Sequence, residues 1–331
     1  MLPEVPVAGS WTALLEQQIL QAAIRKAQSR HYLDILAEQG EPEAERKLLE
    51  AIALTQSEVV QQQVEADLAR GDLQAAENAI PWDKLEHRNK MALAALFGAM
   101  MHRAARATQD RMAGPVAASF EYRPEPLGPE LDSRAAAVAR ETTAASRQAI
   151  GNLLSRFGGE APPGTGAIVR ASIFLTPQAE GAIANWTRRL FEIHGGAELT
   201  DADRAMLRRS GIGARDIARI AHEGLSAEDL AQAIDGYRST LLRERVRAIV
   251  STWLMQAANE GAIDVWRQAV AGGHIAAAVK VWVTMPDPCP ECAAVDGKQV
   301  GLDDLFDTPL GLLPAPPMHP RCRCAVECHP A

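Results

Sequence analysis

The sequence predicts a mainly α-helical protein, with a helical N-terminal half and a C-terminal α+β module that holds a small sheet and a zinc clip. Three observations predict this class. Apolar residues recur at helical spacing over most of the chain. Aromatic residues make up only 5% of the 331 residues while alanine is abundant, which favours helices that pack closely through small side chains. All five cysteines follow residue 288, where soft ligands can converge on one metal ion.

The first elements are expected to be helices. Ser10 can cap a helix whose apolar residues, from Trp11 onward, recur with a period near 3.6 and continue through Ile35. A second helix is expected to start at Glu41-Pro42, because proline suits a first helical turn. The glutamines at 61–63 lie at helical spacing with neighbouring valines, so they indicate a solvated helix face rather than a low-complexity tract.

Residues 83–111 are predicted to form a long helix with a wide apolar stripe. Such a stripe is usually part of a core, and the alternative is an adaptable partner surface. Its members are Leu85, Met91, Leu93, Leu96, Phe97, Met100 and Met101. Prolines and glycines between 114 and 129 predict a loop, and a helix is expected over 131–157. A second break at 161–166 places the domain boundary there, giving a helical region 1–165 and a second domain 166–331.

The second domain is predicted to contain further helices and a few strands. The helices are expected at 177–194, 201–209, 214–223, 227–240 and 241–271. Gly272-Gly273 ends the last of them, and its apolar face predicts that Trp253 is buried. A strand is expected at 279–284, with 298–300 and 322–326 as candidates to pair with it.

The turn Gly211-Ile212-Gly213 resembles the hairpin of a helix-hairpin-helix element, in which backbone N–H groups face a DNA phosphate. The arginines that would ring it are Arg208, Arg209, Arg215 and Arg219. Ile217 stands where a small residue is usual, and such turns are common between helices. Local DNA contact and an ordinary helix–helix turn both remain open.

The cysteine pattern of the tail, residues 281–331, is typical of a tetrahedral zinc site. We expect a structural site of Cys289, Cys292, His319 and Cys322, with Cys324 as the closest substitute among the Cys and His candidates. Cys289 and Cys292 share one side of a tight turn, and Cys322 and Cys324 share one face of an extended strand. The alternatives are free thiols and disulfides. The odd cysteine count and the lack of a signal peptide disfavour disulfides.

A catalytic zinc would need an open coordination position and a nearby acid or base, for which Glu291, Asp296 and Asp287 are the candidates. Prolines crowd both sides of the cysteine motifs, and rigid turns of this kind favour a structural clip. These prolines are Pro286, Pro288, Pro290, Pro316, Pro317 and Pro320.

The residues around the cysteines resemble the C-terminal signature of the phage Mu F-like minor head proteins, also called the phage head morphogenesis family. The motifs are Val281-Trp-Val-Thr284, Asp287, Cys289-Pro-Glu-Cys292, Val295-Asp-Gly297, Phe306 and Pro316-Pro-Met-His-Pro-Arg-Cys-Arg-Cys324. Upstream, Phe174–Gln178 and a helix also resemble the family, which extends the similarity over about residues 170 to 326; the helix residues are Arg245, Ile249, Thr252, Ala257, Asn259, Glu260 and Gly261. One departure is Val250-Ser-Thr-Trp253, where members often read Ala-Arg-Thr-Glu.

The resemblance implies a minor head protein of a tailed phage or prophage, which acts near the portal and assists DNA packaging or ejection. Because the sequence has no Gly-rich phosphate loop, no nucleophile motif and no paired carboxylates on a suitable strand, we do not expect an enzyme. It implies the portal, other capsid proteins and the scaffold as partners, and the virion head and host cytoplasm as locations. Residues 1–165 are expected to supply part of the partner surface through the apolar stripe, while 166–331 are expected to fold without them. The alternatives are an ADP-ribosyltransferase-like effector and a zinc-containing DNA-binding protein.

The charge and hydropathy of the sequence argue against DNA coating, membrane insertion and secretion. Lys and Arg number 34 against 42 Asp and Glu, a net charge of −8, which argues against a protein that coats DNA through an excess of cations. No run of 18 apolar residues exists and the N-terminus lacks a basic start with an apolar core, so we expect neither a membrane segment nor secretion.

Overall fold

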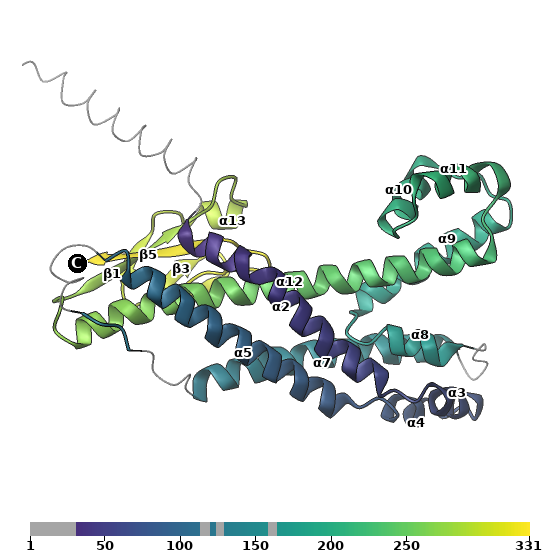
Figure 1. Ribbon diagram of the computed structural model, residues 1–331, viewed down its shortest axis with the longest axis horizontal. Coiled ribbons are helices and arrows are strands. Elements are labelled where there is room, and N and C mark those ends of the chain that lie inside the picture. Colours follow the sequence, from purple (N-terminus) through teal and green to yellow (C-terminus); the bar gives the residue numbers. More distant parts are fainter. Residues whose placement is uncertain (1–30, 113–119, 124–128, 158–163) are drawn as a thin grey trace, which may run out of the picture. The chain divides into compact units, whose positions relative to one another are not determined.

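The computed structural model describes residues 31–112, 120–123, 129–157 and 164–331 (Figure 1). The described part is mainly helical with a small antiparallel sheet near the C-terminus, so the predicted fold class is confirmed. The expected helix at 10–30, much of the loop at 114–129 and the first half of the break at 161–166 lie outside the described residues. None of the described helices has the length and apolar character needed to cross a membrane.

The first described helices are α2 (Tyr32–Ser57), α3 (Gln61–Ala69), α4 (Leu73–Asn78), α5 (Trp82–Gln109) and α7 (Pro129–Phe157). The expected helix start at Pro42 is wrong, because α2 continues through this proline. Ala37, Ala44 and Leu48 are all fully buried along one face of α2. Burial of this continuous face outweighs the hydrogen bond that a proline removes from a helix interior.

The next helices are α8 (Thr165–Ala171), α9 (Pro177–His194), α10 (Asp201–Arg209), α11 (Ala214–Glu223) and α12 (Ala227–Ala271). The bounds of α9, α10 and α11 agree with those predicted. The expected break at residues 240–241 is wrong, because α12 is one helix of 45 residues. Thr240 uses its hydroxyl to bond the carbonyl of Arg209 at 3.0 Å and stays helical. Gly273, at a φ of 71°, follows the end of α12 as expected.

The C-terminal module consists of β1 (Ala278–Val283), α13 (Pro290–Ala293), β2 (Gln299–Gly301), β3 (Phe306–Thr308), β4 (Gly311–Leu313) and β5 (Ala325–Pro330). One antiparallel sheet has the order β2-β1-β5, with Lys280 opposite Val300 and Cys328, and β3 pairs with β4. The strand expected at 322–326 lies instead at 325–330. Cys322 and Cys324 belong to the turn before it, and the sequence did not predict the β3–β4 hairpin.

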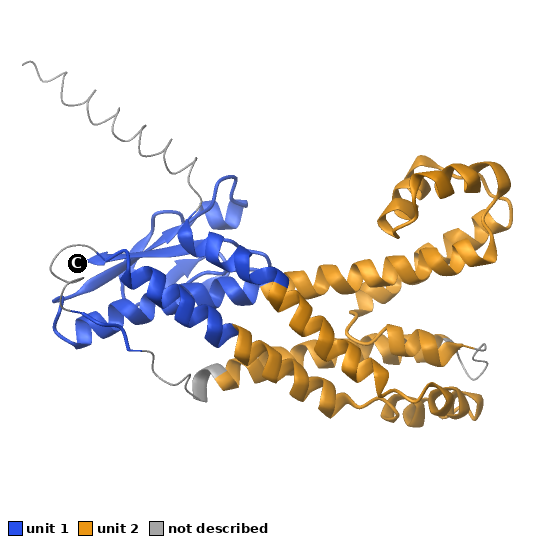
Figure 2. Cartoon of the chain, in the orientation of Figure 1, with its two compact units in different colours: residues 1–42, 97–124, 251–331 blue, residues 43–96, 125–250 orange. Residues whose placement is uncertain are grey.

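Two compact units make up the chain (Figure 2). Unit 1 contains residues 1–42, 97–124 and 251–331, and unit 2 contains 43–96 and 125–250. Each unit therefore combines segments from both sides of the boundary expected near residue 165. Contacts between segments distant in sequence define the units, and local composition carries no signal of such contacts.

The core of unit 1 joins the end of α5 to the second half of α12. Its central cluster consists of Ala105, Met112, Phe120, Tyr122, Val265 and Ala269. Trp253 is buried, as predicted, with its ring centroid 4.9 Å from that of Phe97. Because Leu93 and Phe97 are also buried, the expectation that the α5 stripe forms a partner surface is wrong. Of that stripe, Met91 is 55% exposed.

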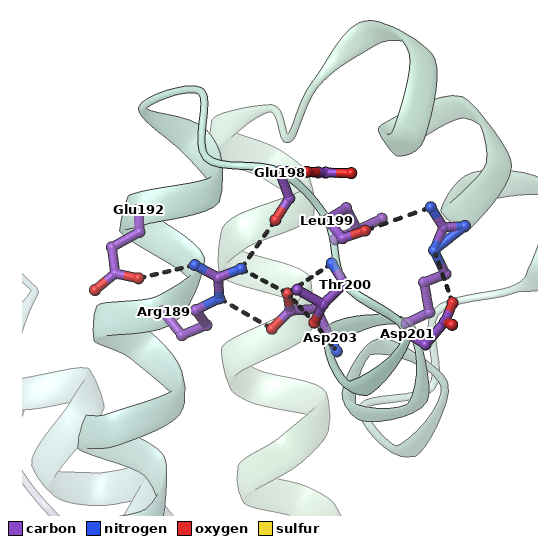
Figure 3. A network of polar contacts seen from close by, with 8 residues as sticks. Arg189, Glu192, Glu198, Leu199, Thr200, Asp201 and Asp203 are labelled. Atoms are coloured by element: carbon purple, nitrogen blue, oxygen red, sulfur yellow. Dashed lines mark hydrogen bonds and ion pairs between the residues drawn. The ribbon is translucent and has the colours of Figure 1, made fainter.

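One core of unit 2 lies between α9, α10, α11 and the start of α12. It contains Leu175, Ile183, Trp186, Leu190, Ile193, Leu207, Ile212, Ile217, Ile220, Leu225, Ala233 and Tyr237. A polar network closes one side of it (Figure 3). Thr200 and Asp203 form a capping box at the start of α10, and Arg189 donates two hydrogen bonds to the Asp203 carboxylate at 3.0 and 2.7 Å.

The Gly211-Ile212-Gly213 hairpin is packed into this core. Ile212 and Ile217 are buried, and a Cβ on Gly236 of α12 would lie 1.8 Å from the Ser210 carbonyl oxygen. Arg209 pairs with Glu244 and Arg219 with Asp229. Two of the four arginines expected to face DNA are therefore in ion pairs. DNA contact at this hairpin stays a prediction.

Candidate metal centre

Cys289 and Cys292 are positioned by the single turn of α13. Cys289 is its N-cap residue, and its sulfur accepts a hydrogen bond from the Cys292 backbone N–H at 3.4 Å. Pro290 at the first helical position has a φ suited to this turn. The pair therefore presents two sulfur atoms to the same side, one of them buried and the other half-buried.

His319 and Cys322 approach this pair from the loop before β5. The Nε2 atom of His319 lies 3.1 Å from the Cys289 sulfur and 3.2 Å from the Cys292 sulfur. The Cys322 sulfur lies 3.6 Å from that of Cys292. Nδ1 of His319 lies 3.0 Å from the Pro320 carbonyl oxygen. Because a carbonyl only accepts, Nδ1 carries the proton and Nε2 has its lone pair free for a metal.

Three of these separations are close to the edges of a tetrahedral zinc site. With Zn–S bonds near 2.3 Å and Zn–N bonds near 2.0 Å, the edges of the tetrahedron are about 3.8 Å between sulfurs and about 3.5 Å between sulfur and nitrogen. The observed Cys292–Cys322 edge of 3.6 Å and the two His319 edges of 3.1 and 3.2 Å are slightly shorter than these values. Cys289, Cys292 and His319 form one group whose ligand atoms all lie within 4.8 Å of one another, and Cys322 approaches this group through Cys292. The complete set of Cys289, Cys292, His319 and Cys322 stays a prediction.

Cys324 forms a second group with Cys292 and Cys322, whose sulfur atoms all lie within 4.8 Å of one another. A hydrogen bond from the Cys324 thiol lowers the pKa of Cys322, and burial raises the pKa of the Cys292 thiol. The hydrogen bond favours the thiolate of Cys322, and thiolates are the form that binds metals. Cys324 remains the closest substitute.

The other two candidates lie elsewhere. Cys328 and His329 are in β5 and take part in neither cysteine–histidine group of the described residues. Burial raises the pKa of the Cys328 thiol to about 12, which disfavours its ionisation at neutral pH. Cys328 therefore serves as a natural control for experiments on the cluster.

Helix α12 holds the cysteine loop through two side chains that the sequence did not identify as functional. Asn259, fully buried, donates to the carbonyls of Pro316 and Cys324 at 3.1 and 3.2 Å and accepts from the Val326 N–H at 2.8 Å. Two helical turns earlier, the Thr252 hydroxyl accepts from the Arg321 N–H at 2.8 Å. Polar residues seven positions apart on an apolar helix face are the signal that identifies such a pair.

Backbone strain lies next to the ligands. Asp287 and Arg321 have φ values of 54° and 61°, a left-handed conformation that costs a non-glycine residue on the order of 1 kcal/mol. One lies two positions before Cys289 and the other directly before Cys322. The Thr252 bond to the Arg321 N–H helps to hold the second of these turns.

Arg323, between two cysteines, ties the loop to the start of α2. Its guanidinium donates to the carboxylate of Asp34, which is 1% exposed, and to Glu41 at 3.1 Å. Both partners precede the loop by more than 280 positions in the chain. The cysteine loop is thus held from two sides by residues of unit 1.

The two carboxylates Asp296 and Glu291, which the sequence offered as catalytic groups, make local contacts within the C-terminal module. Asp296 accepts a hydrogen bond from the Thr284 N–H at 2.9 Å and so joins the end of β1 to the turn after α13. Glu291 is exposed on α13, and the pKa of its carboxyl is lowered by hydrogen bonds from its own backbone N–H and from Cys289.

Comparison with known families identifies the C-terminal region. Residues 214–327 match the family described as Phage Mu protein F like protein. The resemblance inferred from the cysteine motifs is therefore confirmed for this region, which includes all of the expected metal ligands. The match begins at residue 214 rather than near 170, so Phe174–Gln178 lie outside it. Searches among the curated proteins and among the solved structures gave no match.

Proposed function

We propose that this chain is a minor head protein of a tailed phage or prophage that acts in head morphogenesis. The match of residues 214–327 to the Phage Mu F-like family supports this proposal. The chain acts near the portal, where it assists DNA packaging or ejection and contacts the portal, other capsid proteins and the scaffold. It resides in the virion head and, during assembly, in the host cytoplasm.

Residues within the matched region support the same proposal, because the family-like positions make contacts that build one module. Thr252 and Asn259 on α12 hold the cysteine loop, and Asp296 closes the turn after β1. A Cβ on Gly261 would lie 2.2 Å from the Met101 carbonyl oxygen, so α5 passes close to α12 at this glycine.

The test is the protein content of phage heads. Heads purified from the phage or prophage that encodes this chain are expected to contain it at low copy number, measured by quantitative mass spectrometry against the major capsid protein. Full-length tagged chain is expected to co-purify with portal protein. Heads of wild-type phage that lack the chain at every stage of assembly would refute the proposal.

We also propose that Cys289, Cys292, His319 and Cys322 bind one structural zinc ion. When bound, zinc would cross-link α13 to the loop before β5. Because the binding free energy of such a site is also folding free energy, removal of the metal is expected to loosen unit 1 and to leave the core of unit 2 intact. Hydrogen exchange after chelation should rise in residues 278–331 and stay unchanged in residues 175–237.

Metal content tests this site directly. Purified chain is expected to carry about one zinc ion, measured by mass spectrometry of the metal. Cys289→Ser and Cys322→Ser should lower the zinc content sharply, whereas Cys328→Ser, a thiol outside the cluster, should retain it. Loss of zinc in Cys324→Ser with retention in Cys322→Ser would assign the fourth ligand to Cys324 instead. Metal-free wild-type protein with unchanged melting would discard the site.

The proposed role requires no reaction centre, and we propose that the chain is not an enzyme. Multi-turnover hydrolysis or ADP-ribosyl transfer by the purified, zinc-loaded chain would contradict this part of the proposal and favour an effector. Inactive chain in the same assays, together with its presence in heads, is the expected result.

A further inference from the structure

Three exposed leucines gather on the β3–β4 hairpin of unit 1. Leu305, Leu310 and Leu312 are 47%, 59% and 63% exposed. The other exposed large apolar side chains of the described residues come from the helical segments, namely Ile35, Leu54, Val60, Met91 and Phe191. Single exposed apolar residues are normal, whereas a group of them on one short element marks an interaction surface.

The hairpin holds these leucines in fixed positions. Its inner face carries Phe306, which packs edge-on against Trp282 at 5.2 Å between ring centroids. The Thr308 hydroxyl bonds the Gly311 carbonyl at 2.6 Å and the Leu310 N–H at 3.2 Å. These bonds fix the backbone of the turn, so Leu310 and Leu312 stay exposed on the hairpin.

Charge indicates what kind of partner fits. Residues 301–315 contain Asp303, Asp304 and Asp307 and no Lys, Arg or His. Asp303 pairs with Arg267, while no ion pair joins Asp304 or Asp307 to any residue that the structure describes. Asp307 lies directly opposite Leu312 in the hairpin. Lys298 donates to the Asp307 backbone carbonyl at 2.7 Å, so the surface around the leucines carries two carboxylates outside the described ion pairs and one ammonium. The balance is negative, which favours a receptor with a basic rim.

We propose that the β3–β4 hairpin docks into an apolar groove, rimmed by Lys or Arg, on another protein of the phage head. This inference rests on the proposed head function and assigns it a contact surface. A second copy of the chain is the less favoured occupant, because two such hairpins facing each other would bring the same aspartates together.

The test compares variants in the assembling phage. Leu310→Asp/Leu312→Asp is expected to lower the copies of the chain per head at least about tenfold, the size of effect expected from losing 1.4 kcal/mol or more of contact. Asp304→Lys/Asp307→Lys, which keeps the leucines, is expected to lower incorporation in the same direction. Leu54→Asp changes a residue on α2 that is 57% exposed and should leave incorporation unchanged.

The outcomes separate the two proposals. Wild-type chain absent from heads refutes the head function itself. Wild-type chain present, with both hairpin variants incorporated at wild-type level, overturns only the docking surface. Circular dichroism melting checks that the variants fold, and the charge-reversal variant tests the surface if the leucine variant does not. Wild-type dimers in light scattering that dissociate in the leucine variant would assign the hairpin to self-association and overturn the proposed partner.

Discussion

At the scale of single residues, the Asn259 side chain makes three hydrogen bonds to the backbone of the cysteine loop and of β5. One buried amide satisfies the Val326 N–H and two carbonyls, those of Pro316 and Cys324. A buried backbone group left without its partner costs about 1–3 kcal/mol. Asn259 is therefore a positioning residue for the loop that carries the expected ligands.

We predict that Asn259→Ala destabilises the chain by about 3 kcal/mol and lowers its zinc content. Denaturant unfolding and metal analysis measure the two effects. Gln256→Ala, on the same helix and only half-buried, serves as the control and should have little effect on either. An Asn259→Ala protein with unchanged stability would show that water replaces the amide at this position.

Asp203 links stability to pH. Two hydrogen bonds from Arg189 hold the pKa of its carboxyl at about 2, below its ordinary value of 3.8. Because the folded-state pKa is the lower one, the stabilisation is fully present above about pH 4 and is lost as the pH falls towards 2.

Asp203→Asn is expected to cost about 2 kcal/mol at pH 7, and the difference from wild type should vanish near pH 2. Thermal melting of both proteins across this range measures it. Asp201→Asn, whose side chain is fully exposed, should show no such pH dependence. A gap between wild type and Asp203→Asn that persists at pH 2 would assign the effect to altered capping rather than to charge.

At the scale of elements, the contact between the cysteine loop and α2 depends on Arg323. The Asp34 carboxylate with which it pairs is buried, and breaking a buried ion pair by removal of one partner is strongly destabilising. Arg323→Ala is therefore expected to destabilise the chain by on the order of 3 kcal/mol and to raise hydrogen exchange at the start of α2.

The matched control is Arg106→Ala, an exposed arginine of α5 in the same unit. Asp34→Asn should partly rescue Arg323→Ala, because a neutral amide costs less to bury than a carboxylate. Equal melting of Arg323→Ala and Arg106→Ala would show that the loop is held by α12 alone.

At the scale of the whole molecule, unit 1 draws on both halves of the chain. Trp253 packs on Phe97, Val265 and Ala269 share a cluster with Ala105, and Arg323 pairs with Asp34. The sequence suggested that residues 166–331 fold without 1–165. The contacts within unit 1 lead to the opposite expectation, since deletion would expose these apolar faces to water.

We predict that residues 166–331 alone aggregate or lose cooperative melting in unit 1, whereas the cluster between Leu175 and Tyr237 stays protected. The cluster lies wholly within the retained part. Hydrogen exchange by region measures the two outcomes separately. A soluble fragment with a wild-type melting transition and bound zinc would restore the expected independence of the C-terminal domain.

Residue types and their spacing along the chain were sufficient to predict the bounds of several helices and a group of cysteine and histidine residues near the C-terminus. The bounds of α9 and α10 follow from Thr176 and Thr200, whose side chains cap the helices by bonding N–H groups three residues on. Gly213 and Gly224 likewise flank α11. The grouping of Cys289, Cys292 and His319 was predictable because metal sites constrain residue type and spacing over short distances.

Only the tertiary structure showed where helices continue through residues that favour a break, and which side chains surround the cysteine cluster. Pro42 stays within α2 and residues 240–241 within α12, because packing along a whole helix face outweighs a local break signal. Asn259 and Arg323 acquire their roles through partners up to 289 positions away, and the β3–β4 hairpin places its leucines outside the core. Contacts between distant segments depend on how the faces of folded helices and strands pack together, and the spacing of residues along the chain does not predict that packing.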